Sequence, residues 1–329
     1  MKMKYELERA VAISAAIKAS ALCRDVQAGI KAAERITKAD SSPVTVADFG
    51  SQALINLEIK KAFPADQIMA EEDSSPLSSS ARLKFEVVNR VRRIIKDISE
   101  DAVLAAIDLG KSKGCSVGRS WAVDPVDGTK GFLRGGQYAV AIALIEKGKV
   151  VVGVLGCPNL ALDFRDESSE RGSLLIAVQN QGAYMRAYNG RIEKTIHVSQ
   201  VKNPAKAGFT ESYESEHSSH PRAARIAELL AVKKAPLRMD SQCKYALVAR
   251  GEVAFYLRLP VRADYQEKIW DHAAGSIIVQ EAGGMITDIN GRALDFSAAR
   301  QLSENQGIIV TNGSIHEAVL TAAGTAAAE

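Results

Sequence analysis

The chain has 329 residues, a length that predicts more than one domain, because single hydrophobic cores stop growing at about 250–300 residues. Hydrophobic residues make up 47% and charged residues 25%, proportions that exclude a disordered, coiled-coil or fibrous chain. Forty-two Lys and Arg against 39 Asp and Glu leave a net charge of +3, too small for a dedicated nucleic-acid binder.

Neither the start of the chain nor its cysteines indicate secretion. Charges continue through Arg9, so the segment from Met1 has no apolar core of a signal peptide. No apolar run reaches the roughly 18 residues that a membrane-spanning helix needs. The four cysteines lie far apart, without a C-x-x-C pair, at Cys23, Cys115, Cys157 and Cys243. We therefore expect a cytoplasmic protein with reduced thiols, no membrane partner and no structural zinc.

Long helices open the chain. Apolar side chains recur every three or four positions over residues 5–35, from Val46 to a stop at Pro64, and over 81–98, which predicts three helices. A polar, Ser-rich loop is expected at 74–80.

Short strands follow Trp121. Segments 138–146 and 149–156 flank a Lys147-Gly148 turn and predict a β-hairpin. Further strands are predicted at 174–178, 183–187 and 191–198. We therefore expect residues 1–200 to form an N-terminal α+β domain, with long helices on a largely antiparallel sheet.

Strands and helices alternate from about residue 200, which is typical of an α/β domain. Helices are predicted at 221–233, 241–249 and 270–282 and after Ser314. Strands are predicted at 236–239, 253–259, 285–289 and 307–311. We expect residues 201–329 to form this C-terminal domain.

The most informative motif is Asp-Pro-Val-Asp-Gly-Thr at Asp124–Thr129. Pro125 fixes φ and Gly128 permits conformations closed to other residues, so the backbone turns sharply after a buried strand. Such a turn aims both carboxylates and the Val126 carbonyl at one point, and this hard-oxygen set suits Mg²⁺ rather than zinc. Taken alone, the motif is equally compatible with a solvated turn of common turn residues.

Three other acidic segments change that balance. Asp48 ends Ser-Pro-Val-Thr-Val-Ala-Asp, and residues 71–73 form the triplet Glu-Glu-Asp after an apolar run. Asp271 stands in Trp-Asp-His-Ala-Ala-Gly, ahead of an apolar helix. Two of them have a simpler alternative: a polar loop for the triplet and a helix N-cap for Asp271.

Together, these four segments resemble the lithium-sensitive, magnesium-dependent phosphatase superfamily of inositol monophosphatase and fructose-1,6-bisphosphatase. Its two signatures, Asp-Pro-hydrophobic-Asp-Gly-Thr and Trp-Asp-x-Ala-Ala-Gly, are complete at Asp124–Thr129 and Trp270–Gly275. The resemblance implies an α+β / α/β fold, a layered αβαβα sandwich, with most metal ligands before residue 200.

Longer segments narrow the resemblance to the 3′(2′),5′-bisphosphate nucleotidases of that superfamily. They are Ser42–Asp48, Asp127–Tyr138, Val154–Asn159 and Tyr265–His272, and the likeness runs from the first helix to the last strand. It implies hydrolysis of the 3′-phosphate of adenosine 3′,5′-bisphosphate (PAP) to AMP and phosphate, and action on 3′-phosphoadenylyl sulfate (PAPS).

The resemblance also implies a residue set. Metal ligands are Asp48, Glu71, Asp124, Val126 (by its carbonyl), Asp127 and Asp271, around two or three Mg²⁺. Asp48 and Thr129 form the catalytic pair that activates water. Substrate-binding residues are Gly128, Thr129, His217, Ser241, Lys244 and Arg258. From the residues alone, Lys244 and Arg258 read as exposed, solvated side chains. Arg134 is a further candidate for the second phosphate.

Five expectations complete the prediction. Li⁺, and in some members Na⁺, inhibits such enzymes, and we expect a monomer or weak dimer. The alternative within the superfamily is an inositol polyphosphate 1-phosphatase. A non-catalytic nucleotide or metal sensor would be expected to lack a carboxylate or Thr129, and all are present. Nucleic-acid binding has no basic run or aromatic ladder to support it.

Overall fold

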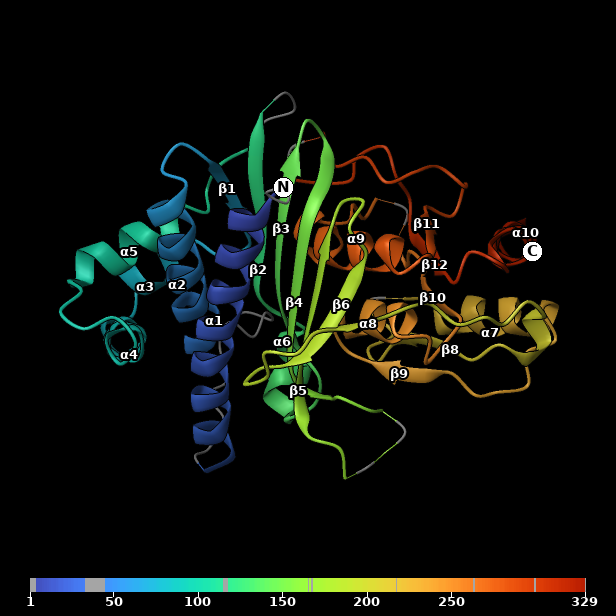
Figure 1. The fold of residues 1–329 in the computed structure, drawn as a ribbon, viewed down its shortest axis with the longest axis horizontal. Coiled ribbons are helices and arrows are strands. Elements are labelled where there is room, and N and C mark those ends of the chain that lie inside the picture. The colour runs from blue at the N-terminus through green and yellow to red at the C-terminus, as the bar shows by residue number, and fades with distance from the viewer. Residues whose placement is uncertain are drawn as a thin grey trace.

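Helices and sheets alternate in five layers in the computed structural model, as Figure 1 shows. The structure describes residues 4–32, 45–114, 118–164, 166, 168–216, 218–262, 264–298 and 300–328. From one side to the other run the N-terminal helices, a large sheet, a middle helical layer, a smaller sheet and two outer helices (Figure 1). The predicted αβαβα sandwich is therefore confirmed.

The first layer covers one face of the large sheet with long helices. Its elements are α1 (Glu6–Ala32), α2 (Val46–Ala62), α3 (Ser75–Ser78), α4 (Ala81–Arg92) and α5 (Glu100–Asp108). Thr45 caps α2 through its side chain, which accepts from the Ala47 amide, and Asp48 closes a reciprocal capping box with the Thr45 amide. This cap places Asp48 at the sheet-facing end of α2.

The large sheet has seven strands in chain order. They are β1 (Gln67–Ala70), β2 (Arg119–Asp127), β3 (Ala139–Glu146), β4 (Lys149–Ala161), β5 (Arg171–Val178), β6 (Ala183–Ala187) and β7 (Lys194–Thr195). Only β1 and β2 pair in parallel, so their carboxyl ends meet at one edge. The short helix α6 (Thr129–Arg134) follows β2 directly. The predicted hairpin at 138–156 is confirmed as β3 and β4.

The smaller sheet orders its strands β11-β12-β10-β8-β9. They are β8 (Phe209–Ser212), β9 (Leu237–Met239), β10 (Phe255–Arg258), β11 (Met285–Thr287) and β12 (Ile308–Thr311). Helices α8 (Cys243–Ala249) and α9 (Ala273–Glu281), with the 3-10 turns η1 (Pro204–Lys206) and η2 (Ile269–Asp271), belong to the same half. Helices α7 (His220–Leu229) and α10 (His316–Ala328) form the outer layer (Figure 1).

Three apolar clusters bind the layers together. One lies between α1, α2 and the large sheet, and it includes Phe49, Trp121 and Ile142. A second joins the other face of that sheet to α8 and α9 and includes Tyr245. A third packs the outer helices on the smaller sheet. The division into domains at residue 200 stays a prediction, although the large sheet uses residues 67–195 and the smaller one 209–311.

Several local predictions differ from the structure. The Ser-rich segment 74–80, expected to be a loop, contains the short helix α3, and the strand expected over 191–198 is reduced to β7. The expected helix over 81–98 ends at Arg92, because Asp97 adopts a positive φ of 63° and Ser99 caps a new helix at the Ala102 amide. Strands β1 and β8, of four residues each, were not predicted. None of the helices in the described ranges combines the length and the apolar character needed to cross a bilayer.

Candidate active site

A cleft of about 670 Å³ opens where the two sheets meet the middle helices. It gathers ten of the twelve predicted site residues: Glu71, Asp124, Val126, Asp127, Gly128, Thr129, Ser241, Lys244, Arg258 and Asp271. Asp48 lies behind the cleft wall rather than on it, and His217 falls outside the described residues.

The end of β2 builds the floor of the cleft. Pairing with β3 is irregular between Asp124 and Asp127, which frees this stretch from the ladder. The Asp124 side chain accepts a 3.1 Å hydrogen bond from the Val126 amide, and the Val126 carbonyl accepts one of 3.2 Å from the Thr129 hydroxyl. The motif is therefore a structured turn and not a solvated one.

Gly128 is required at this turn for two reasons. Its φ of 85° lies in the left-handed region, which disfavours side chains. A Cβ on Gly128 would also lie only 2.9 Å from the Cβ of Ser241. Ser241 itself has a φ of 66°, so two left-handed residues from different halves of the chain pack against each other at the cleft.

Asp48 and Thr129 are in contact, as predicted. The Thr129 hydroxyl lies 3.4 Å from Oδ1 of Asp48, while Oδ2 of Asp48 accepts from the amide and hydroxyl of Thr45 at 2.7 and 2.6 Å. Burial raises the pKa of Asp48, and these hydrogen bonds oppose that shift. Because both oxygens have protein partners, the geometry fits a partner of Thr129 better than a metal ligand.

Four carboxylates form what we call the acidic cluster: Glu71, Asp124, Asp127 and Asp271. Desolvation raises the pKa of all four, and the charges of neighbouring acids add to it for Glu71, Asp124 and Asp271. Although the Glu71 side chain is open to the cleft, protein atoms surround it closely, and it shares a hydrogen bond with Asp124. Two carboxylates in such contact need a proton or a cation between them.

Two buried glutamines fix the backbone around the cluster. The side-chain amide of Gln52, on α2, bonds to both the carbonyl and the amide of Glu72, at 2.6 and 2.9 Å. The backbone amide of Gln242 donates to Asp127 at 2.5 Å, and its side chain bonds to the Trp270 carbonyl and the Gly275 amide. Gln242 thereby connects Asp127 on β2 to the turn that carries Asp271.

Arg258 is held by a buried chain of polar groups rather than left free. Its guanidinium forms two 2.8 Å contacts with Glu267 and lies 3.7 Å from Asp271. Glu267 also contacts Nε2 of His272, whose Nδ1 contacts the Tyr245 hydroxyl at 2.7 Å. The Arg258 and His272 partners lower the pKa of Glu267 to about 2, despite the opposing effect of its burial.

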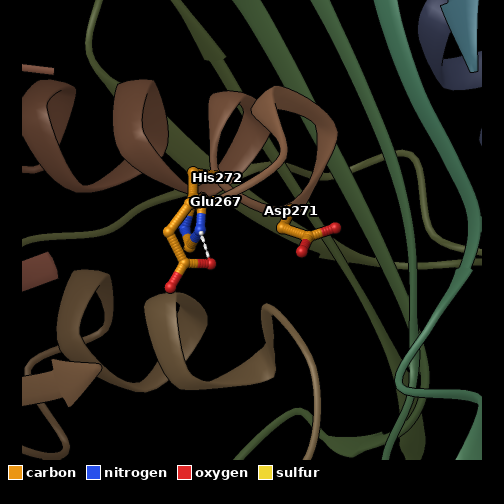
Figure 2. A group of neighbouring side chains, drawn as sticks. All are labelled: Glu267, Asp271 and His272. Carbon is orange, nitrogen blue, oxygen red and sulfur yellow. Dashed lines mark hydrogen bonds and ion pairs between the residues drawn. The ribbon is translucent and has the colours of Figure 1, made fainter. Parts of the chain in front are cut away.

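These polar contacts distinguish two groups of residues that could bind a metal: the acidic cluster, and the group formed by Glu267, Asp271 and His272. Ligand atoms of Glu267, Asp271 and His272 lie within 4.8 Å of one another. Glu267 and His272 already bind each other, as the dashed line in Figure 2 shows, whereas the Asp271 carboxylate points away from them. Only Asp271 is therefore available to a cation in the cleft, together with the other members of the acidic cluster.

Lys244 is buried, not an exposed helix lysine. Its ammonium donates to the carbonyls of Ser241 and Met239 at 2.8 and 3.2 Å. Burial lowers the pKa of Lys244 to about 8, and the nearby Asp127 charge opposes this. Two of the three ammonium donors thus support the Ser241 turn, which leaves one for a ligand.

The rim of the cleft carries paired charges. Lys130 contacts Glu216 at 2.6 Å, and Arg134 contacts Glu214 and, at 2.8 Å, Asp240. Among the described lining residues, eight are acidic and five are basic, so the cleft repels anions unless cations are added. The bare carboxylates and the Val126 carbonyl form the hard-oxygen set that Mg²⁺ prefers.

Sequence reasoning missed the residues that hold the site in place. They are Gln52, Gln242, Tyr245, Glu267, His272 and Arg300. Glu267 and His272 lie within the recognised segment Tyr265–His272. Their positions, four residues before and one residue after Asp271, could have indicated that they support it. The remaining contacts join segments far apart in the chain, and no local spacing announces them.

Comparisons with known proteins identify the family of the chain. The family model described as "Inositol monophosphatase family" matches residues 4–327. A 3′(2′),5′-bisphosphate nucleotidase of Emericella nidulans is 44% identical over 97% of this chain and 98% of its own. One from Oryza sativa is 45% identical over 97% and 94%.

Solved structures share the fold at low identity. An inositol monophosphatase from Anabaena has a TM-score of 0.63 at 22% identity, covering 98% of this chain and 97% of its own. One from Zymomonas mobilis has a TM-score of 0.64 at 20% identity, covering 98% and 100%. The chain therefore belongs to the inositol monophosphatase family, as a phosphatase similar to its 3′(2′),5′-bisphosphate nucleotidases.

Proposed function

We propose that this protein is a Mg²⁺-dependent phosphomonoesterase that removes the 3′-phosphate of PAP, giving AMP and phosphate, and that it also acts on PAPS. The observation that carries the proposal is the cluster of bare carboxylates in a cleft with more acids than bases. An anionic substrate is bound there only with added cations. The names of the relatives supply the substrate class.

The acidic cluster and the Val126 carbonyl would hold two or three Mg²⁺ ions. Bound there, such ions supply charge neutralisation for the phosphoryl oxygens and a more acidic water. The raised pKa values of the carboxylates support this assignment, because they reflect burial first and the charges of neighbouring acids second, and a bound cation would offset both.

Thr129 and Asp48 would orient the attacking water. The hydroxyl of Thr129 directs its proton toward Asp48 or the Val126 carbonyl, so its lone pairs are free to accept from water. The water oxygen forms the new bond to phosphorus, the ester bond to the ribose oxygen breaks, and a proton passes to that oxygen. Buried Asp48 accepts a proton more readily because burial raises its pKa.

The remaining residues would bind the substrate. Gly128 is the N-cap of α6 and Thr129 its first residue; both line the cleft, and their backbone amides would bind a phosphate group. Lys244 and Arg258 supply positive charge beside the acidic cluster, and Ser241 packs against Gly128 and accepts a hydrogen bond from Lys244. Li⁺, and to a lesser degree Na⁺, would inhibit by competing for a Mg²⁺ position.

Phosphate release from PAP, PAPS and inositol 1,4-bisphosphate tests the proposal. The purified protein is assayed at equal substrate concentrations with Mg²⁺, with EDTA, and with EDTA followed by excess Mg²⁺. We expect PAP to be hydrolysed fastest, activity to vanish in EDTA, and Mg²⁺ to restore it. Equal or faster release from the inositol compound would refute the nucleotide assignment and favour an inositol polyphosphate 1-phosphatase.

A further inference from the structure

We propose that Arg300 is a positioning residue, which holds the Glu71 and Asp271 ends of the acidic cluster at their working separation. The inference rests on the proposed metal-dependent function and extends it to a residue outside the cluster. Arg300 lies in the loop between β11 and β12 and lines the cleft.

On one side, the guanidinium binds the segment that presents Glu71. It donates to the carbonyl of Ala70, the residue before Glu71, and to those of Gly110 and Ser112 at 3.0 Å each. The Ala70 amide donates in turn to the Gly110 carbonyl at 2.9 Å. One side chain therefore joins the carboxyl end of β1 to the loop after α5.

On the other side, the same guanidinium lies over the ring of Trp270, with its central carbon 4.5 Å from the ring centroid. Trp270 directly precedes Asp271. The backbone of Arg300 adds a second connection, because its carbonyl accepts from the Ile269 amide at 3.2 Å. Side chain and main chain thus fix the η2 turn that carries Asp271.

The chemistry of this contact requires arginine. A planar guanidinium offers five donors and an aromatic-stacking face, whereas a lysine ammonium offers three donors from a single point. Within the described part of the chain, Arg300 binds carbonyls and an aromatic ring rather than a carboxylate. Its positive charge is therefore not consumed by an ion pair, and its contacts serve to join two backbone segments.

Loss of this connection would let the two ends of the cluster move apart. Groups that orient metal ligands typically contribute about 10–100-fold to metal affinity. The Gln52 side chain still binds Glu72, and the Gln242 side chain still binds the Trp270 carbonyl at 2.9 Å, so each segment keeps one other anchor. We therefore expect a weakened metal site in a folded protein rather than an unfolded one.

The test compares Arg300→Gln and Arg300→Lys with the control Arg250→Gln. Arg250 also binds backbone carbonyls with its guanidinium, those of Ala161 and Leu162 at 2.9 Å each, but it does not line the cleft. Mg²⁺ binding to each metal-free protein is measured by isothermal titration calorimetry without substrate, and thermal unfolding is measured in parallel.

We expect Arg300→Gln to weaken Mg²⁺ binding by about 10–100-fold, Arg300→Lys to lie between it and wild type, and Arg250→Gln to bind as wild type does. Equal Mg²⁺ affinity in Arg300→Gln, Arg300→Lys and wild type would overturn the proposal for Arg300. Absence of Mg²⁺ binding by the wild-type protein would instead refute the proposed function, so the two failures are distinguished.

Discussion

Replacing Glu267 by glutamine removes the charge that holds Arg258 while keeping nearly the same shape. The Glu267 side chain is 4% exposed and that of Arg258 12%, so the variant leaves a guanidinium without its bidentate partner in a buried place. Asp271, 3.7 Å away, is then the nearest acid to attract it. We expect Glu267→Gln to be less stable and to bind metal less well.

The size of the stability loss follows from the pKa of Glu267. A fall from the ordinary value of 4.5 to about 2 corresponds to roughly 3 kcal/mol, at about 1.4 kcal/mol for each pH unit. Removing one partner of a buried ion pair typically costs about 3–5 kcal/mol. Both routes predict a loss of about 3 kcal/mol in the free energy of unfolding at neutral pH.

The pH dependence has a definite sign. Because the pKa is lowered in the folded state, the stabilisation is complete above pH 4.5 and is lost as the pH falls from 4.5 through about 2. Urea unfolding followed by circular dichroism, in EDTA between pH 7 and pH 3, measures the difference between wild type and Glu267→Gln. That difference should shrink as Glu267 becomes protonated.

A difference that stays constant down to pH 3 would refute the ion pair as its origin and point to packing instead. Asp264→Asn is the matched control, since Asp264 pairs with Arg262 on the surface, where both side chains are largely exposed. Such exposed pairs contribute little, so this variant should unfold as wild type does at every pH.

Three further predictions concern the cleft. Thr129→Ala should lower kcat by about 10²–10⁴-fold, and Thr129→Ser should retain most activity, because the hydroxyl that contacts Asp48 is lost only in the alanine variant. Equal losses of kcat in both variants would contradict the water-orienting role of Thr129. Gly275→Ala should lower the free energy of unfolding by about 1–3 kcal/mol, because the added Cβ would lie 2.4 Å from Cγ of Tyr245. Gly324 has open space around it, so the control variant Gly324→Ala should not be destabilised in thermal unfolding. Mg²⁺ binding should release protons and become stronger as the pH rises, because the metal-free carboxylates have raised pKa values and must first lose their protons. Calorimetry in two buffers of different ionisation enthalpy measures the released protons. A Mg²⁺ affinity that does not change with pH would count against the acidic cluster as the metal site.

The motifs at Asp124–Thr129 and Trp270–Gly275 were predictable because each consists of neighbouring residues in the sequence. Asp124, Asp127 and Gly128 lie within five consecutive positions, and these residue types are typical of a tight turn. The β3–β4 hairpin was equally visible, since apolar runs flank a Lys-Gly turn whose two residues both have positive φ. Local rules therefore recovered the turn and the hairpin, whereas the family and its layered fold followed from the resemblance of these motifs to known phosphatases.

The supports of the site were not predictable by the same rules. Arg300 reaches Ala70 across 230 positions, and its partners are backbone carbonyls, which every residue has. Gln242 follows a recognised serine but resembles any surface glutamine in sequence. The N-cap interpretation of Asp271 is wrong, because His272 occupies that position and Asp271 belongs to the preceding 3-10 turn.

The left-handed pair at Gly128 and Ser241 has a consequence for how substitutions at the cleft can accumulate. Each residue fills space that a larger neighbour would need, so neither surface can grow by one methyl group unless the other recedes. Changes in the turn at Asp124–Thr129 are therefore tied to changes in the segment that carries Lys244. A search for altered substrate range would therefore mutate both turns in the same library, because any side chain added at position 128 meets Ser241.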